Sequence, residues 1–476
     1  MTRIPPSWLL ILTAVSTSFA ETQLDYVELL SADGRPIEAK IISQDGQTIR
    51  IERRDGQRFE VPLAQFSQES QSIITAQLEA ASQPHGNGLV QADRLNEVFG
   101  IPLLSSTSFW QETESSLMGR IRWPLESETQ SSSSYRIYPG SNYKILSRRP
   151  HSAVCYFGGG SPELISIVFA NKGDSFNEAP SPREAERFIR DAIKADGDAI
   201  EQRLTAAFGE AKRQSYGEGR STRQRIQRWD VSDIAILLSN IPGEYVGLQI
   251  VPTYVADNKG VSDRLSDSDV RQMAKGNVIE RTNGDVVIDN IPMVNQGPKG
   301  YCAPATFERY LRYMGLTADM YLLALAGQTQ IGGGTYMAPL LDGVRSMLSR
   351  NNRSLSEIRK MPDLRSIKKF IDEGRPVMWT LYSTRRFNDL SDNRSATRKQ
   401  VSDWDEWDRH LRDYRKNAKS IPAQSNNAHI AMIIGYNDDT GEIAFSDSWG
   451  PDYSERWLTE EELLAFSQGF NYVVDF

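Results

Sequence analysis

Three Asp-Gly pairs near the N-terminus constrain the fold of that part of the chain more than any other feature. They are Asp33-Gly34, Asp45-Gly46 and Asp55-Gly56, and they separate short runs in which apolar residues alternate with polar ones. Asp-Gly between alternating runs is typical of hairpin turns, and the alternation places every second side chain on one face of a sheet. We therefore expect residues 21–80 to form a small β-barrel, closed by an amphipathic helix over residues 64–80.

The first 20 residues have the pattern of a cleaved export signal. An apolar run over residues 8–15 follows Arg3, and the small residues Ser18 and Ala20 stand where a signal peptidase reads. The run is far shorter than the ~20 residues needed to span a bilayer, and no later stretch reaches that length. We predict a secreted or periplasmic protein that keeps no integral membrane segment once residues 1–20 are removed.

Length and composition indicate a folded protein of several domains. The chain has 476 residues, of which 39% are apolar, and a formal net charge of −8, so a nucleic-acid partner is not expected. Residues 81–90 contain Pro, Asn and two Gly and are predicted to form a linker.

Residues 91–275 have strand-like runs around one long helical pattern, and residues 276–476 form the predicted C-terminal domain. The predicted fold class is therefore α+β. In the long pattern, the apolar residues that recur at helical spacing are Phe188, Ala192, Ile193, Ile200, Leu204 and Phe208.

Two cysteines, Cys155 and Cys302, occur in the whole chain. An exported protein can form disulfides, so one hypothesis pairs them and excludes catalysis at Cys302. In the other hypothesis Cys155, within the apolar run HSAVCYF, is a small buried hydrophobe and Cys302 is reactive.

The stretch NQGPKGYCAPATF, residues 295–307, places Cys302 at the start of a predicted helix. Apolar residues recur at helical spacing from Phe307 to Met314, and Pro304 fits a first turn because its missing N–H would be unpaired there. The dipole and the free N–H groups at a helix N-terminus favour a thiolate and lower the pKa of the thiol. Cys302 is therefore the candidate nucleophile.

A base and its supporting groups can be found in the same region. His429 opens the strand-like run HIAMIIGY, and Asp447 follows the run IAFS after a short turn. Two strands joined by a short turn lie side by side, so Asp447 can accept from the imidazole and fix its tautomer. Gln296, six residues before Cys302, can donate to an oxyanion together with the Cys302 N–H.

The pattern Q-G-x-x-G-Y-C-A-P-A-T, followed by H-I-A-M-I-I-G-Y and D-S-W-G, resembles the papain-like cysteine peptidases, especially the branch that includes bacteriocin leader peptidases. The resemblance implies a helical lobe packed on an antiparallel sheet, with the cleft between them. It also implies these roles: Gln296 as the oxyanion glutamine, Cys302 as the nucleophile, His429 as the base, Asp447 as its orienter, Trp449 as a shield of the His–Asp contact, and Gly300 and Tyr301 as support of the substrate cleft.

The chain departs from the family pattern in two ways. Papain has asparagine at the position of Asp447, and the bacteriocin branch also shows this asparagine-to-aspartate exchange. This departure is therefore compatible with catalysis. Leader peptidases are usually fused to a membrane transporter, and because this chain shows none, cleavage after a double glycine is not inferred.

Residues 385–425 form a charged, helix-like insertion before His429 that is placed to act as a lid or a substrate-selecting flap.

The N-terminal stretch DGRPIEAKI…DGQTIRIERRDGQRFEVPL resembles a small SH3-like domain first described in a yeast actin-cytoskeleton adaptor. Such modules bind a protein or cell-surface partner or merely position their neighbours, and both roles stay open.

Together these features predict an exported cysteine peptidase that hydrolyses peptide bonds of a peptide or protein substrate through a thioester at Cys302. No metal or organic cofactor is expected, since no metal-ligand spacing such as C-x-x-C or H-x-x-x-H occurs. Two alternatives remain open: a catalytically inactive binding or scaffold protein, and a transglutaminase-like acyltransferase.

Overall fold

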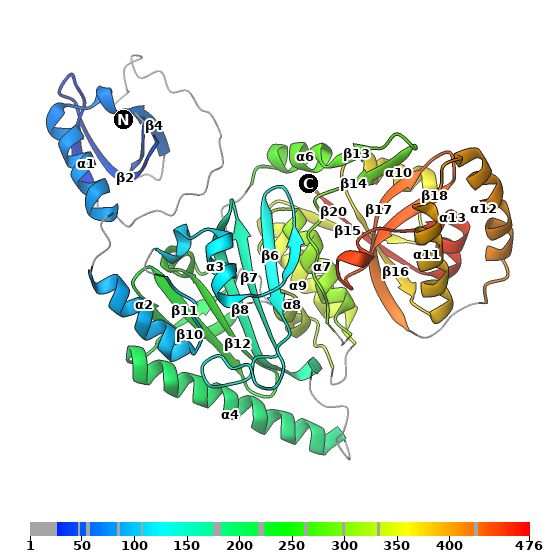
Figure 1. Cartoon of the computed structure of the whole chain (residues 1–476), viewed down its shortest axis with the longest axis horizontal. Coiled ribbons are helices and arrows are strands. Elements are labelled where there is room, and N and C mark those ends of the chain that lie inside the picture. The colour runs from blue at the N-terminus through cyan, green and yellow to red at the C-terminus, as the bar shows by residue number, and fades with distance from the viewer. Residues whose placement is uncertain are drawn as a thin grey trace. The chain divides into compact units, whose positions relative to one another are not determined.

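The computed structural model describes residues 26–45, 48–53, 58–82, 86–105, 108–174, 182–217, 223–260, 265–297, 300–330, 334–422 and 427–476 (Figure 1). The chain divides into two compact units, residues 1–121 with 158–162 and residues 122–157 with 163–476. Within the described ranges, no helix has both the length and the apolar character needed to cross a membrane. The predicted signal at residues 1–20 lies outside the described residues.

The N-terminal strands pair in chain order in a four-stranded antiparallel sheet: β1 (Val27–Leu30), β2 (Pro36–Asp45), β3 (Thr48–Arg53) and β4 (Arg58–Pro62). The 3-10 turn η1 (Leu63–Gln65) and helix α1 (Gln68–Ser82) follow. Gly34 has a φ of 82°, which glycine adopts easily, whereas Gly46 and Asp55-Gly56 lie outside the described residues. One core gathers alternate strand residues, as the period-two pattern predicts, and these are Leu29, Ala39, Ile41, Ile49, Ile51 and Val61. Phe66, which follows η1, and Ile74 of α1 complete it. The finer expectation of an SH3-like barrel stays a prediction.

Most of the predicted linker at 81–90 falls in helices. Residues 86–90 are the first turns of α2 (Gly86–Phe99), and residues 81–82 end α1, while 83–85 lie outside the described residues. Glycine weakens a helix by about 1 kcal/mol without forbidding it. The buried side chains of Leu95 and Phe99 stabilise this helix through packing. The turn η2 (Phe109–Gln111) and helix α3 (Glu114–Ile121) come next.

The middle region forms an eight-stranded sheet in the order β5-β6-β7-β8-β12-β11-β10-β9. Its strands are β5 (Leu125–Glu128), β6 (Ser132–Ile137), β7 (Ser152–Gly158), β8 (Ser161–Asn171), β9 (Lys212–Tyr216), β10 (Gln224–Val231), β11 (Ile234–Ile241) and β12 (Tyr245–Pro252). The connecting helices are η3 (Lys172–Asp174), α4 (Pro182–Phe208), α5 (Thr253–Asp257) and α6 (Asp267–Gly276). We call this eight-stranded sheet the middle sheet.

Helix α4 packs along β10, β11 and β12 of the middle sheet (Figure 1). Its buried apolar residues include Ile189, Ile193, Ile200 and Leu204. Phe188, which the helical spacing grouped with this stripe, is 59% exposed. Neighbouring helical residues point about 100° apart, and Ile189 takes the inward position instead.

The C-terminal region packs helices against a second eight-stranded sheet. The main path of this sheet is β13 (Val278–Glu280), β14 (Asp285–Ile288), β17 (Ala428–Asn437), β16 (Val377–Tyr382), β20 (Ser467–Asp475) and β15 (Ser354–Arg359), with β18 (Glu442–Ser446) and β19 (Arg456–Thr459) branching from β17. The helices are α7 (Cys302–Tyr313), α8 (Met320–Ala326), α9 (Met337–Arg350), α10 (Leu364–Asp372), α11 (Arg385–Arg398), α12 (Trp404–Ala418), η4 (Pro451–Tyr453) and α13 (Glu460–Phe466). One apolar core joins sheet and helices. The mixture of sheets and helices is compatible with the predicted α+β class.

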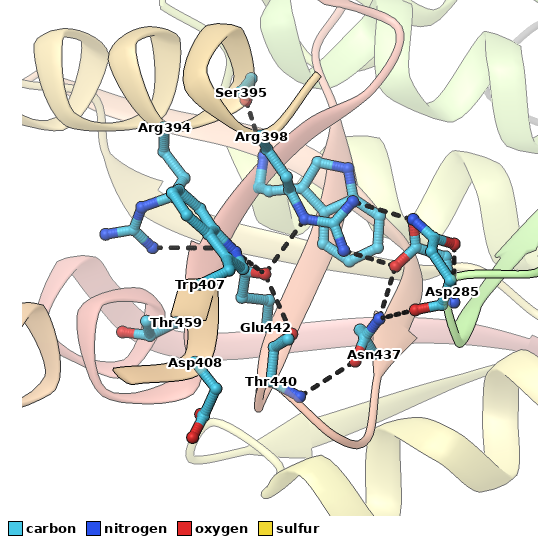
Figure 2. A network of polar contacts seen from close by, with 12 residues as sticks. Asp285, Arg394, Ser395, Arg398, Trp407, Asp408, Asn437, Thr440, Glu442 and Thr459 are labelled. Carbon is cyan, nitrogen blue, oxygen red and sulfur yellow. Dashed lines mark hydrogen bonds and ion pairs between the residues drawn. The ribbon is translucent and has the colours of Figure 1, made fainter. Parts of the chain in front are cut away.

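The insertion at residues 385–425 forms α11 and α12, and buried charges anchor both helices (Figure 2). Arg398 of α11 donates to Asp285 through Nη1 at 2.8 Å and to Glu442 through Nε at 3.0 Å. Trp407 of α12 donates to the same Glu442 carboxylate at 2.9 Å. Removing such contacts would leave buried carboxylates without partners, so α11 and α12 are a fixed part of the domain. The expectation that the insertion acts as a lid or a substrate-selecting flap stays a prediction.

Candidate active site

Cys302 is the first residue of α7, where the sequence predicts it, and its side chain is half-buried. Two contacts hold α7 against the strands that carry the other candidate residues. Thr306 Oγ1 donates to the Ile430 carbonyl of β17 at 3.2 Å, and Arg309 Nη2 donates to Ser446 Oγ of β18 at 2.6 Å. The start of α7 is thus fixed against the β17–β18 hairpin.

The hairpin itself is irregular at one glycine. Met432 of β17 lies opposite Ser446 of β18, and the register shifts between Ile433 and Gly435. A Cβ at Gly435 would lie 2.5 Å from the Val286 carbonyl oxygen, so only glycine fits beside β14 at this bulge. The hairpin brings the start of β17 beside the residues that follow β18.

His429 and Asp447 meet at the end of this hairpin. His429 Nε2 lies 2.7 Å from Asp447 Oδ1, and both side chains are buried. Because Nε2 faces the carboxylate, Nδ1 is the ring nitrogen available to the thiol. The Trp449 ring stacks on the imidazole, with centroids 4.9 Å apart and planes at 28°. Trp449 therefore covers one face of the His429 ring, as a shield of this contact would.

Cys302 and His429 shift each other's pKa, and Asp447 adds to the shift of His429. Burial acts to raise the pKa of the Cys302 thiol, but the hydrogen bond and charge of His429 bring that pKa below its ordinary value. Burial acts to lower the pKa of His429, but Asp447 and Cys302 together raise it to about 10. Both shifts favour the thiolate–imidazolium form of the pair, and the two titrations are coupled.

Arg456 supports Asp447 from the side away from His429, and nothing in the sequence analysis pointed to it. Arg456 Nη1 donates to Asp447 Oδ2 at 2.6 Å, and both side chains are almost fully buried. Burial acts to raise the pKa of Asp447, but the hydrogen bond and charge of His429 and the charge of Arg456 bring it below the ordinary aspartate value. The carboxylate stays ionised while it orients the imidazole.

Arg456 also connects the site to α11. Its Nη2 lies 2.9 Å from Asp392 Oδ1 and donates to Ser391 Oγ. The insertion thus reaches Asp447 through one guanidinium. Only the fold reveals this contact, because no sequence spacing relates β19 to a helix more than 50 residues earlier.

Gln296 is held beside the residues that follow Asp447. Its backbone N–H donates to the Ser448 carbonyl at 2.9 Å, and its side chain is 9% exposed. Gly300 is half-buried at the start of the segment that enters α7. Tyr301 was expected to support the substrate cleft, and it is fully buried, with its hydroxyl accepting from Asn171 Nδ2 at 3.1 Å. Tyr301 thus supports α7 from within the core.

Neither a disulfide nor a metal cluster is found in the part of the chain that the structure describes. Cys155 is buried in β7 and Cys302 heads α7, and no disulfide joins them. No group of three His, Cys, Asp or Glu side chains among the described residues is arranged to hold a metal ion. The hypothesis that paired the two cysteines is therefore wrong.

The match to a known family falls on this region of the chain. Residues 288–472 match the model of the Peptidase_C39 like family. The match supports a papain-like cysteine peptidase domain in the C-terminal part of the chain. It spans the segment from β14 to β20 and includes Gln296, Cys302, His429 and Asp447. No curated protein matches the chain.

Proposed function

We propose that the C-terminal domain hydrolyses peptide bonds through a thioester formed at Cys302. The observation that supports this most strongly is the contact chain Cys302–His429–Asp447, in which the thiol pKa is lowered and the imidazole pKa is raised to about 10. A structural cysteine has no need of a buried imidazolium held by a carboxylate, whereas a nucleophile has.

In the proposed mechanism the Cys302 thiolate attacks the carbonyl carbon of the peptide bond. The oxyanion accepts hydrogen bonds from the Gln296 side-chain amide and the Cys302 backbone N–H. His429 gives its proton to the departing amine and then takes one from the water that attacks the thioester. Asp447 keeps the ring oriented through both proton transfers, and Arg456 keeps Asp447 ionised.

The N-terminal parts of the chain fit this function as accessory segments. We propose that residues 1–20 direct export to the periplasm or the outside of the cell. The module at 21–80 would contact a protein or cell-surface partner as an SH3-like domain. Its strands β1 to β4 and their alternating core support this assignment.

The proposal is tested by hydrolysis of a mixed-sequence peptide library by wild type, Cys302→Ala and His429→Ala. Cleavage by wild type alone, with all three proteins folded, supports it. Cys155→Ala is the matched control, since Cys155 is buried in β7 and should leave hydrolysis unchanged.

The same samples separate the alternatives. Incorporation of a fluorescent amine into a glutamine-containing protein, without net hydrolysis, would replace the peptidase by a transglutaminase-like acyltransferase. Absence of both reactions in wild type would leave an inactive binding or scaffold protein.

A further inference from the structure

The segment Met293–Gly297, which carries Gln296, has no regular structure of its own. It lies between β14 and α7 and belongs to no helix or strand. Its backbone groups must therefore find partners elsewhere, and those partners decide where the Gln296 side chain is held.

Side chains of β5, together with Tyr138 just after β6, supply partners for Met293 and Asn295. The Met293 N–H donates to Ser127 Oγ at 2.9 Å. The Asn295 N–H donates to Glu126 Oε1 at 2.9 Å, and its carbonyl accepts from the Tyr138 hydroxyl at 2.7 Å. Both backbone groups of Asn295, the residue next to Gln296, are thus held by side chains of β5 and of the residue after β6. We call Glu126, Ser127 and Tyr138 the clamp.

The clamp is itself rigid because its carboxylate is buried and paired. Glu126 Oε1 accepts from Arg136 Nε at 2.6 Å, and Oε2 accepts from Ser134 Oγ at 3.2 Å. Arg136 Nη2 also lies 3.7 Å from Glu308 of α7, and both charged side chains are almost fully buried. The Arg136 guanidinium therefore lies between Glu126 of the clamp and Glu308 on the helix that Cys302 begins.

Tyr138 also packs against the turn that follows Gln296. Gly297 has a φ of 71°, and its N–H donates to Asn295 Oδ1 at 3.0 Å. A Cβ at Gly297 would lie 3.1 Å from Cζ of the Tyr138 ring. The ring thus covers the left-handed turn while the hydroxyl holds the preceding carbonyl.

We propose that Tyr138 and Glu126 are positioning residues for the oxyanion glutamine, so that the middle sheet is an integral part of the catalytic unit. This inference rests on the proposed function, because it concerns the geometry of the Gln296 amide during acylation. Removing an oxyanion donor lowers kcat by about 100- to 1,000-fold. A donor that is kept but less well positioned should lower kcat by less, roughly 10-fold.

The test compares Tyr138→Phe with wild type in two reactions of Cys302. Peptide hydrolysis passes through an oxyanion, whereas alkylation by iodoacetamide does not. We expect a lower kcat with an unchanged KM for hydrolysis, and an unchanged rate of alkylation. Tyr143→Phe is the matched control, because this half-buried tyrosine of the same region accepts from Trp123 Nε1 at 2.9 Å, within its own domain.

Hydrogen–deuterium exchange over residues 293–297 makes the outcome independent of activity. Faster exchange in Tyr138→Phe and in Ser127→Ala, with no change in Tyr143→Phe, supports the clamp. Wild-type exchange and wild-type kcat in Tyr138→Phe would overturn it. A parallel fall in alkylation would also overturn it, because the effect would then be on the whole site.

If wild type hydrolyses no peptide while the exchange difference is present, the proposed function fails and the clamp stands.

Discussion

Arg456→Met should destabilise the protein strongly, because it removes the cation behind Asp447 and keeps the apolar stem. Arg456 is 1% exposed, its Nη1 lies 2.6 Å from Asp447, and its Nη2 lies 2.9 Å from Asp392. The substitution leaves one oxygen of a fully buried carboxylate without its partner. Breaking a buried ion pair in this way costs about 3–5 kcal/mol in the free energy of unfolding. We expect a value near the lower limit, since Asp447 keeps its hydrogen bond to His429.

The assay is urea unfolding followed by tryptophan fluorescence, at neutral and at acidic pH. The folded pKa of Asp447 lies below the ordinary aspartate value, so the stability given by its ionised form is present above that value. This stability is lost as the pH falls through the folded pKa. The difference between wild type and Arg456→Met should therefore be largest near neutrality and shrink in acid.

A nearby surface pair gives the matched control. Arg281 makes two hydrogen bonds to Glu455, at 2.8 and 2.7 Å, but its side chain is 40% exposed. Exposed pairs are worth at most about 1 kcal/mol, so Arg281→Met should have a small effect. Equal losses in the two variants would refute the reasoning, because burial would then not decide the cost.

Three further outcomes follow from the same contacts. Asp447→Asn should also lower the free energy of unfolding, because the asparagine NH₂ would face the Arg456 donors. Adding Arg456→Met should restore part of that free energy in a double-mutant unfolding cycle. Arg398→Met should lower the free energy of unfolding in urea by about 3–5 kcal/mol, because two buried carboxylates lose their shared cation. Arg385→Met, with a side chain 94% exposed, should show no measurable change. In a pH–kcat profile, hydrolysis should rise as Cys302 ionises, at a pH below the ordinary thiol range. It should fall only as the pH approaches about 10, where His429 loses its proton. A fall near the ordinary histidine pKa would contradict the raised pKa of His429.

Local patterns in the sequence predict much of the scaffold. The start of α7 at Cys302 follows from helical spacing and Pro304, and both are properties of neighbouring residues. The hairpin that joins His429 and Asp447 follows from two apolar runs with a short turn. Period-two alternation predicts the core of β1 to β4 because each strand pairs with the next along the chain.

The missed features depend on contacts between distant segments. Arg398 lies in a highly charged helix that a sequence pattern assigns to the surface, yet 113 residues separate it from its partner Asp285. The Tyr138 contact with Asn295 spans 157 residues and joins the end of β6 to the segment before α7. A charged residue gives no local sign of which buried partner it will meet, so the anchored insertion and the clamp could not be predicted.

The pH dependence of Cys302 alkylation in wild type and His429→Ala tests the central claim most directly. We predict that wild-type Cys302 reacts with iodoacetamide at mildly acidic pH, whereas Cys302 in His429→Ala reacts only as the pH nears the ordinary thiol value of about 8.5. Cys155 is buried in β7 and should stay unlabelled in both native proteins, which provides an internal control. Identical profiles for Cys302 in the two proteins would contradict an ion pair between the thiolate and the imidazolium.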